Sequence, residues 1–469
     1  MTSVLRAGER RFRKAACILA AVIAVGAAAT AGAGPSTPGS AISRSQTKAF
    51  KVTVSYVAEF YPLWLSYFQS LYASKNHLIG PDRVTQLYQI VVAINVDTLY
   101  ASTFLDLTDE PVVLTVPSTG VRYSILTLDP YGDVFDSGLP AQTPGVFALT
   151  GPQFTGDLPD GVTRISMPLN HAIIIFRADK YSSAGENQKK DAEIFRKSLL
   201  TQTLSNWKQN QSGGATGILP QAFFAVPFKT AADTLVAADP VTFLTQLQAA
   251  VHAANTPPLS SKQQELSDKF DKLFAEGKNT YEFGQAVQAA HTLILDRYLA
   301  HTGKTNWIHF TNIGEWTPHQ DLDRSAIAEF IQYGNNIDAA AYYHAFSDGT
   351  GAALDGTDPA GYVLKIPKKE IPQAERFWSF TAYTPESIEL VKNRAQKYEI
   401  ASYTPGLTYD SDGGVTLYLA REQPAGVPAA NWLPVPKGHF NIMLRVYGPE
   451  GSVADNSYVP PAIAKQTSN

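Results

Sequence analysis

Polar side chains alternate with strand-like apolar runs between Val91 and Phe135, and several of them belong to types that carry chemistry. Polar groups threaded through buried β-structure must find partners or line a cavity, because unpaired burial costs roughly 1–3 kcal/mol per group. This stretch is therefore the candidate site. Its polar members are Asn95, Asp97, Thr98, Tyr100, Arg122, Tyr123, Asp129 and Tyr131.

Asp97 is the member of this stretch best suited to acid–base chemistry. It stands between Val96 and Thr98 in an apolar context, where its carboxyl needs an arginine, a backbone N–H or a tyrosine hydroxyl as a partner. We expect Asp97 to act as the catalytic acid or base, with Tyr100 as a hydrogen-bond donor. A hydrogen-bonded corner that joins two strands is an equal alternative. The expected substrate-binding residues are Asn95, Thr98, Arg122, Tyr131 and Tyr383.

Other charged residues of the region have simpler interpretations. Asp129 precedes a proline and Asp133 follows a glycine, which favours turn chemistry over catalysis. Arg122, Arg164 and Arg177 accompany the strands. An arginine that points inward would pair with Asp97 or bind a substrate carboxylate through two hydrogen bonds.

The motifs of several large enzyme classes are missing from the sequence. It contains no G-x-S-x-G elbow, phosphate-binding glycine loop, H-E-x-x-H or dinucleotide fingerprint. The only cysteine is Cys17, and the nine histidines are scattered singly. His291 and His301 are ten positions apart, which is not a standard ligand spacing. We therefore expect a protein that needs neither a metal nor a cofactor.

The first residues are typical of an export signal. A basic region with five arginines and lysines precedes an apolar, alanine-rich run from Ala15 to Ala29, followed by A-x-A cleavage patterns. Removing residues 1–33 leaves 33 basic and 41 acidic residues, a net charge of −8 against −4 for the whole chain. An acidic surface argues against nucleic acid as the partner. We expect a periplasmic or extracellular protein without a membrane span, an uncleaved anchor being the alternative.

Periodicity divides the remaining chain into β-rich and helical parts. Helical patterns are expected at 50–71, 189–209, 240–254, 261–274, 283–302 and 325–346, and strands over 86–177 and after 349. The predicted fold class is α+β, with two antiparallel β-rich domains, sandwich- or jelly-roll-like, and a helical segment between them. The predicted units are a signal peptide (1–33), a leader (34–47), an N-terminal domain (48–184), a helical connection (185–348) and a C-terminal domain (349–469).

The chain resembles bacterial proteins that join the domain of unknown function 1254 to the domain of unknown function 1214. The motif Asn95-Val-Asp-Thr-Leu-Tyr100 and the pairs Arg122-Tyr123 and Asp129-Pro-Tyr131 carry the first match. The second is carried by Phe377-Trp-Ser379, Asn431-Trp-Leu-Pro434, Leu444-Arg-Val-Tyr447 and Pro460-Pro461. The turn at Tyr409-Asp-Ser-Asp412 departs from the pattern. The resemblance implies an envelope or exported location, oligomers, and a pocket in the first domain near the domain interface. It implies no established reaction.

Two functions follow as hypotheses. The first is a metal-independent hydrolase or lyase that acts on a small organic or carbohydrate-like molecule in a pocket of the N-terminal domain, in a protein that forms homo-oligomers. The alternative is a non-catalytic envelope scaffold that binds a glycan or a protein through an open aromatic groove.

Overall fold

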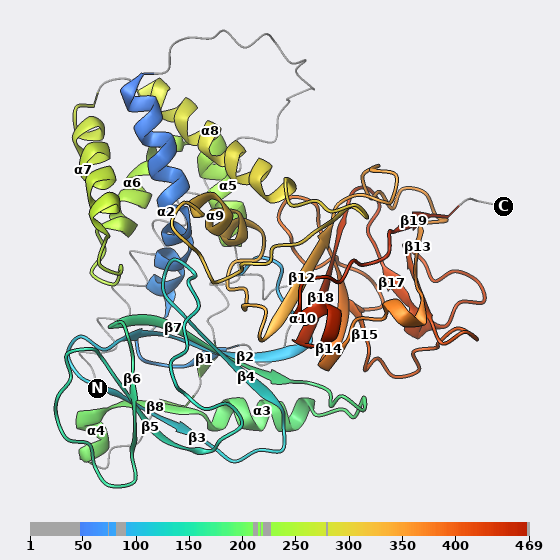
Figure 1. Ribbon diagram of the computed structural model, residues 1–469, viewed down its shortest axis with the longest axis horizontal. Coiled ribbons are helices and arrows are strands. Elements are labelled where there is room, and N and C mark those ends of the chain that lie inside the picture. The colour runs from blue at the N-terminus through green and yellow to red at the C-terminus, as the bar shows by residue number, and fades with distance from the viewer. Residues whose placement is uncertain are drawn as a thin grey trace.

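The computed structural model describes residues 47–73, 75–80, 91–209, 214–215, 217–218, 227–277 and 280–466 (Figure 1). For 214–215 and 217–218 it describes the backbone alone. The predicted signal peptide and all of the predicted leader except Thr47 lie outside these ranges. Within them, no helix is both long and apolar enough to cross a membrane.

The N-terminal half consists of two sheets packed face to face. One has the strand order β10-β1-β2-β7-β4 and the other the order β6-β5-β3-β8-β9. Because side chains alternate along a strand, Leu99 and Ile174 of the first sheet turn toward Leu114 and Phe147 of the second and form one core. The strands are β1 (Ile79–Gly80), β2 (Thr98–Asp106), β3 (Val112–Val116), β4 (Tyr123–Leu128), β5 (Gly145–Thr150), β6 (Thr163–Ser166), β7 (His171–Asp179), β8 (Leu200–Thr203), β9 (Gly214–Ala215) and β10 (Gly217–Ile218); α3 (Lys189–Ser198) and α4 (Leu204–Lys208) accompany them.

The C-terminal half repeats this arrangement with a second pair of sheets, at the right of Figure 1. The orders are β11-β12-β18-β14-β15 and β17-β16-β13-β19. Trp378 and Leu444 of the first sheet pack against Leu364 and Leu417 of the second. The elements are β11 (Trp307–Ile308), β12 (Ala340–Ala345), β13 (Tyr362–Ile366), η2 (Lys368–Glu370), β14 (Ala374–Tyr383), β15 (Glu399–Ala401), β16 (Val415–Ala420), η3 (Ala429–Asn431), β17 (Trp432–Pro434), β18 (Asn441–Pro449), α10 (Gly451–Ala454) and β19 (Ala464–Lys465).

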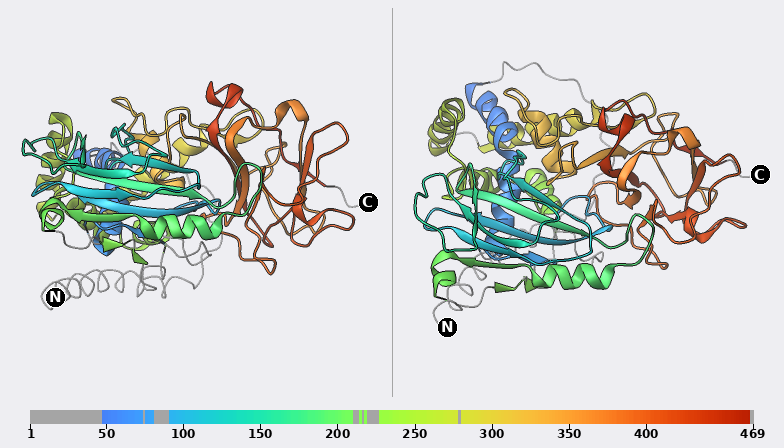
Figure 2. Two further views of the ribbon diagram at one scale, coloured as in Figure 1. Left: turned by 90° about the horizontal axis from the view of Figure 1, so that it is seen from below. Right: turned by 60° about the horizontal axis from the view of Figure 1, so that its bottom comes forward.

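A layer of helices covers the outer face of the sheet that contains β2 and β7, as the views in Figures 1 and 2 show. The long helix α2 lies at its centre and packs against α6, α7, α8 and α9. The largest core joins this layer to one sheet of each half, through side chains such as Phe60, Ile175 and Met443. The helices are α2 (Lys48–Tyr72), α5 (Phe228–Ala238), α6 (Pro240–Val251), α7 (Ser261–Ala275), α8 (Thr280–Leu299) and α9 (Asp321–Phe330).

Helix α2 continues through Pro62, which has no N–H to donate to the carbonyl four residues earlier. That carbonyl, on Ala58, instead accepts a hydrogen bond from the Ser325 hydroxyl at 2.7 Å. The next carbonyl, on Glu59, accepts one from the Arg324 guanidinium at 3.0 Å. Both donors belong to α9, so the proline fixes where the short helix docks on the long one.

The predicted α+β class with two β-rich halves and helices between them is confirmed. Neither half closes into a barrel among the described residues, and most strand pairs are antiparallel, with parallel pairs at β1–β10, β5–β6 and β16–β17. The predicted boundaries at 184/185 and 348/349 stay predictions, although β8 and β12 from within 185–348 belong to the sheets of the two halves.

Two helix predictions are wrong in part. The helix expected over 189–209 is interrupted at Leu200–Thr203, because this segment pairs with β3 and extends that sheet. The helix expected over 325–346 ends at Phe330, Gln332 adopts a φ of 60°, and Ala340–Ala345 forms a strand between β11 and β18. In both places, pairing with strands that are remote in sequence overrides the local helical pattern.

Candidate functional site

A cavity lies where the two halves and the helical layer meet. The space between protein atoms in and at the mouth of this cavity is about 780 Å³, part of which is open to solvent. One wall is apolar and includes Phe104, Ile173, Ile175 and Ile331. The polar side chains on the lining are Gln69, Asn95, Tyr100, Ser102, Arg177, Tyr333, Tyr342, Arg445 and Tyr447. A mostly apolar hollow with a few convergent polar groups is the usual form of a small-molecule site.

The N-terminal wall of the cavity presents a tyrosine and an arginine side by side. In the antiparallel pair of β2 and β7, Tyr100 lies directly opposite Arg177, so both side chains leave the same face of the sheet. The Arg177 guanidinium carbon is 5.4 Å from the centre of the Tyr100 ring. Its two Nη atoms donate to Asn335 Oδ1 at 2.9 Å and to the Tyr333 carbonyl at 2.8 Å. The guanidinium is thus held rigidly in a buried position.

The C-terminal wall presents the same pairing. Tyr342 of β12 lies directly opposite Arg445 of β18, and Tyr447 leaves the same face two residues further on. The buried Arg445 guanidinium donates from Nη2 to the Ala93 carbonyl and lies 5.5 Å from the centre of the Tyr383 ring. Two cross-strand tyrosine–arginine pairs, one from each half, therefore line the same cavity.

Two asparagines tie the walls together. Asn95 Nδ2 donates to the Tyr447 hydroxyl at 2.6 Å and to Thr98 Oγ1 at 3.3 Å, and Asn95 Oδ1 accepts from the Asp97 backbone N–H. Asn335, which accepts from the guanidinium of the N-terminal wall, also donates from Nδ2 to the Tyr342 hydroxyl at 2.8 Å. The Asn95–Tyr100 motif consequently fixes the cavity through contacts with the other half of the chain.

Asp97 lies behind the cavity instead of on its lining. Its carboxylate accepts hydrogen bonds from Ser379 Oγ at 2.7 Å and from the Tyr403 hydroxyl, both on the C-terminal half. Burial raises the pKa of Asp97, and the hydrogen bonds from these two hydroxyls lower it in part. Lys180, the residue that follows β7, donates from Nζ to the Val96 carbonyl at 2.8 Å. The carboxylate thus fastens one half of the chain to the other.

The other predicted site residues are spread over several places. Asn95 and Tyr100 line the cavity, and Thr98 and Tyr383 are buried beside it, the latter donating to the Ile94 carbonyl at 2.8 Å. Arg122 is half exposed and pairs with Glu375 at the surface. Tyr131 packs under Arg324 and lines a smaller hollow next to Trp316. The structure therefore brings together four of these six residues, and Arg122 and Tyr131 lie outside the group.

Sequence reasoning missed most of the C-terminal wall. Tyr342 fell within a predicted helix, and Arg445 entered only as a member of the Leu444–Tyr447 motif. Arg177 was recognised only as one of three strand arginines. The signal available was alternation: Tyr100 and Ser102 on one strand, and Arg445 and Tyr447 on another, recur at every second position and so share a face.

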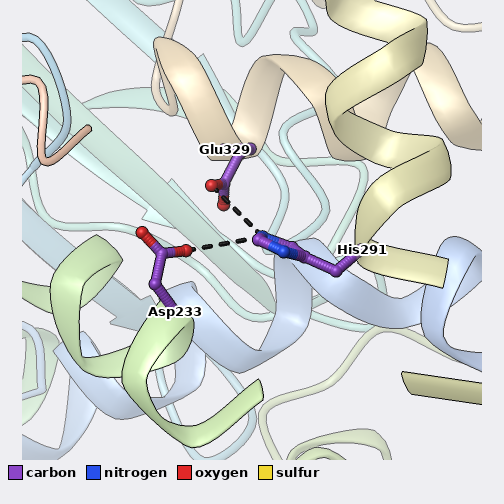
Figure 3. A group of neighbouring side chains, drawn as sticks. All are labelled: Asp233, His291 and Glu329. Carbon is purple, nitrogen blue, oxygen red and sulfur yellow. Dashed lines mark hydrogen bonds and ion pairs between the residues drawn. The ribbon is translucent and has the colours of Figure 1, made fainter. Parts of the chain in front are cut away.

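A second polar cluster lies inside the helical layer (Figure 3). His291 of α8 faces Asp233 of α5 and Glu329 of α9, with Nε2 3.4 Å and 3.3 Å from their carboxylate oxygens. Burial lowers the pKa of His291, but the two carboxylates outweigh it and raise the pKa to about 9. Lys229 donates to both carboxylates, and Tyr61 donates to Glu329.

These side chains have the identity and spacing of metal ligands, since the ligand atoms of Asp233, His291 and Glu329 lie within 4.8 Å of one another. The charges, however, already cancel. Two carboxylates face the protonated imidazole and the ammonium of Lys229, which occupies the space between the carboxylates. A divalent cation would add charge to a balanced cluster, so the residues do not fit a metal. The cluster instead holds α2, α5, α8 and α9 together.

These observations define a two-part α+β protein with a cavity at the junction of its parts, and comparison with known proteins likewise finds two parts in the chain. The family described as "Protein of unknown function (DUF1254)" matches residues 75–202, and "Protein of unknown function (DUF1214)" matches residues 339–451. The chain belongs to the bacterial proteins that carry a DUF1254 domain followed by a DUF1214 domain.

Solved structures resemble the chain along most of its length. The VPA0106 protein from Vibrio parahaemolyticus is 19% identical with a TM-score of 0.56, over 90% of this chain and 100% of that one. An uncharacterized protein from Burkholderia cenocepacia is 14% identical with a TM-score of 0.43, over 89% and 94% of the two chains. The first likeness shows a shared fold. No curated protein matches the chain.

Proposed function

We propose that this protein binds a small organic molecule with an apolar body in the cavity between its two halves. The observation that carries the proposal is the lining: an aliphatic and aromatic wall closed by polar groups that come from three separate parts of the fold. Apolar contact supplies affinity, and the few fixed polar groups supply orientation. The abundance of aliphatic side chains on the wall favours an apolar body over a sugar.

A binding scaffold with an open aromatic groove has less support. Among the described residues, the large apolar side chains that are exposed are Ile194, Tyr281, Leu293, Leu299, Tyr409 and Val459. Only two of them are aromatic, and they lie apart, Tyr281 in the helical layer and Tyr409 in the C-terminal half. Tryptophan and tyrosine are concentrated in buried positions instead, which fits an enclosed ligand.

Catalysis as a hydrolase or lyase is the second candidate, and Tyr100 favours it. Tyr100 lines the cavity, and burial raises the pKa of its hydroxyl above the ordinary value, so that the hydroxyl is protonated at neutral pH and able to donate a hydrogen bond to a bound substrate. Asp97 would need to reach the ligand to act as the acid or base, and its carboxylate contacts Ser379 and Tyr403 instead. The basic and apolar N-terminal sequence supports export to the periplasm or the outside of the cell.

Filling the cavity tests the proposal. Ser102 of β2 lines the cavity, and Ser102→Phe puts a ring into the space that the ligand would occupy. Ser166→Phe, on the exposed end of β6, is the matched control. Ligand-detected NMR with straight-chain acids and amides of four to ten carbons should show binding to the wild type and the control and none to Ser102→Phe. Equal binding to both variants, or no binding by any chain length to the wild type, would contradict the proposal.

A further inference from the structure

The charges around the cavity do not balance, and the imbalance identifies the chemical class of the ligand. No aspartate, glutamate or histidine of the described residues lines the cavity, whereas two arginines do. Burial lowers the pKa of the Arg445 guanidinium, whereas neighbouring tyrosines and the nearby Asp97 raise it, and the net shift is upward. The positive charge of Arg445 is thus offset by Asp97, which lies behind the cavity wall.

Arg177 has no such counter-ion. Its hydrogen bonds go to an amide oxygen and a backbone carbonyl, and among the described residues no carboxylate oxygen lies within ion-pair distance of it. Its Nε–H also has no hydrogen-bond acceptor among the described residues. A buried cation without an ionic partner is costly, and an anion that enters the cavity removes that cost.

Two tyrosine hydroxyls are prepared to donate to the same anion. The Tyr342 hydroxyl accepts from the Asn335 backbone N–H at 3.0 Å and from Asn335 Nδ2 at 2.8 Å. The Tyr447 hydroxyl accepts from Asn95 Nδ2 at 2.6 Å. Both oxygens thus act as acceptors, two bonds for Tyr342 and one for Tyr447, and neither hydroxyl donates a hydrogen bond to another described residue. Each O–H proton is therefore available to a ligand.

We propose that the ligand carries a carboxylate, which the Arg177 guanidinium and the hydroxyls of Tyr342 and Tyr447 bind at the polar end of the cavity, with an aliphatic body against Ile173 and Ile175. This inference rests on the proposed function of the same cavity. One uncompensated positive charge matches a single negative charge, which favours a carboxylate over a doubly charged phosphate. Donors that converge from both halves would also make ligand binding hold the halves together.

The test compares hexanoate with hexanamide, which have the same shape and differ in charge, by titration calorimetry of the full chain at pH 7. Hexanoate should bind the wild type at least about 10-fold more tightly, as expected for charge-assisted hydrogen bonds. Arg177→Gln should weaken hexanoate about 10- to 100-fold and leave hexanamide within about 3-fold. Arg164→Gln, an exposed strand arginine, is the matched control and should change neither.

A second variant keeps the test decisive if Arg177→Gln does not fold. Tyr447→Phe removes one donor and keeps the ring, so hexanoate should bind about 3- to 10-fold more weakly; Tyr418→Phe, on the remote strand β16, should have no effect. Equal affinity for acid and amide, or hexyl phosphate binding more tightly than hexanoate, would overturn the carboxylate while the cavity proposal stands. If neither the acid nor the amide binds, and no other chain length does, both proposals fail.

Discussion

Replacing Asp97 with asparagine distinguishes an anchoring residue from a catalytic one. The Asp97 carboxylate accepts hydrogen bonds from Ser379 at 2.7 Å and from Tyr403, and it is buried. An asparagine side chain has the same shape but one acceptor oxygen, so its NH₂ group must face one of the two hydroxyl donors. Losing that bond and leaving a donor unsatisfied costs about 1–3 kcal/mol.

Removing the negative charge of Asp97 has the opposite effect on the free energy of unfolding. Because burial raises the pKa of Asp97, the ionised carboxylate opposes folding, and removing its charge recovers part of this desolvation cost. We therefore expect Asp97→Asn to lower the free energy of unfolding by about 1–2 kcal/mol. Asp97→Ala leaves both hydroxyls without an acceptor and should cost about 3–4 kcal/mol.

Urea unfolding at pH 7 measures these losses, and calorimetry with hexanoate measures binding per folded molecule. The Asp97→Asn protein should bind hexanoate within about 3-fold of the wild type, because Asp97 does not line the cavity. A double-mutant cycle with Ser379→Ala should show a coupling energy of at least about 0.5 kcal/mol. Unchanged stability together with a loss of binding greater than about 10-fold would refute the anchoring role.

Three further predictions concern buried charges. The pKa of His291 is about 9 in the folded protein, above the ordinary value of about 6.5, so its stabilisation is complete below pH 6.5 and is lost as the pH rises through 9; wild-type stability should fall by roughly 3 kcal/mol over this window and that of His291→Gln should not. Lys229 and His291 hold the pKa of Glu329 at about 2 despite burial, so Glu329→Gln should cost roughly 3 kcal/mol in urea unfolding, and Zn²⁺ should not raise the wild-type midpoint. Asp179 and Arg376 form a buried ion pair between the halves, so Asp179→Asn should cost about 3–5 kcal/mol, whereas the double change to leucine should recover most of it.

Strand and helix positions were largely predictable because burial on one face leaves a period in the sequence. The continuous apolar run of β7 and the aromatic spacing in α2 identified these elements. The failures at Leu200–Thr203 and Ala340–Ala345 have one cause: each segment completes a sheet whose other strands come from distant parts of the chain. Local propensity carries no information about that pairing.

The candidate site was predictable only on one side. The Asn95–Tyr100 motif contains two lining residues, and its polar character in a buried context marked it. The choice of Asp97 as the catalytic member came from its type alone, and the direction of its side chain depends on Ser379 and Tyr403 across the interface. Arg177 and Tyr447 meet only because two sheets turn particular faces toward each other, which no spacing in the sequence encodes.

A crystal structure of the protein soaked with hexanoate would show whether the cavity binds a carboxylate. We predict density for the ligand in the cavity, with a carboxylate oxygen within hydrogen-bond distance of Arg177 Nε and the carbon chain against Ile173 and Ile175. Density at the neighbouring hollow beside Lys75 and His171, with the cavity itself empty, would contradict the account.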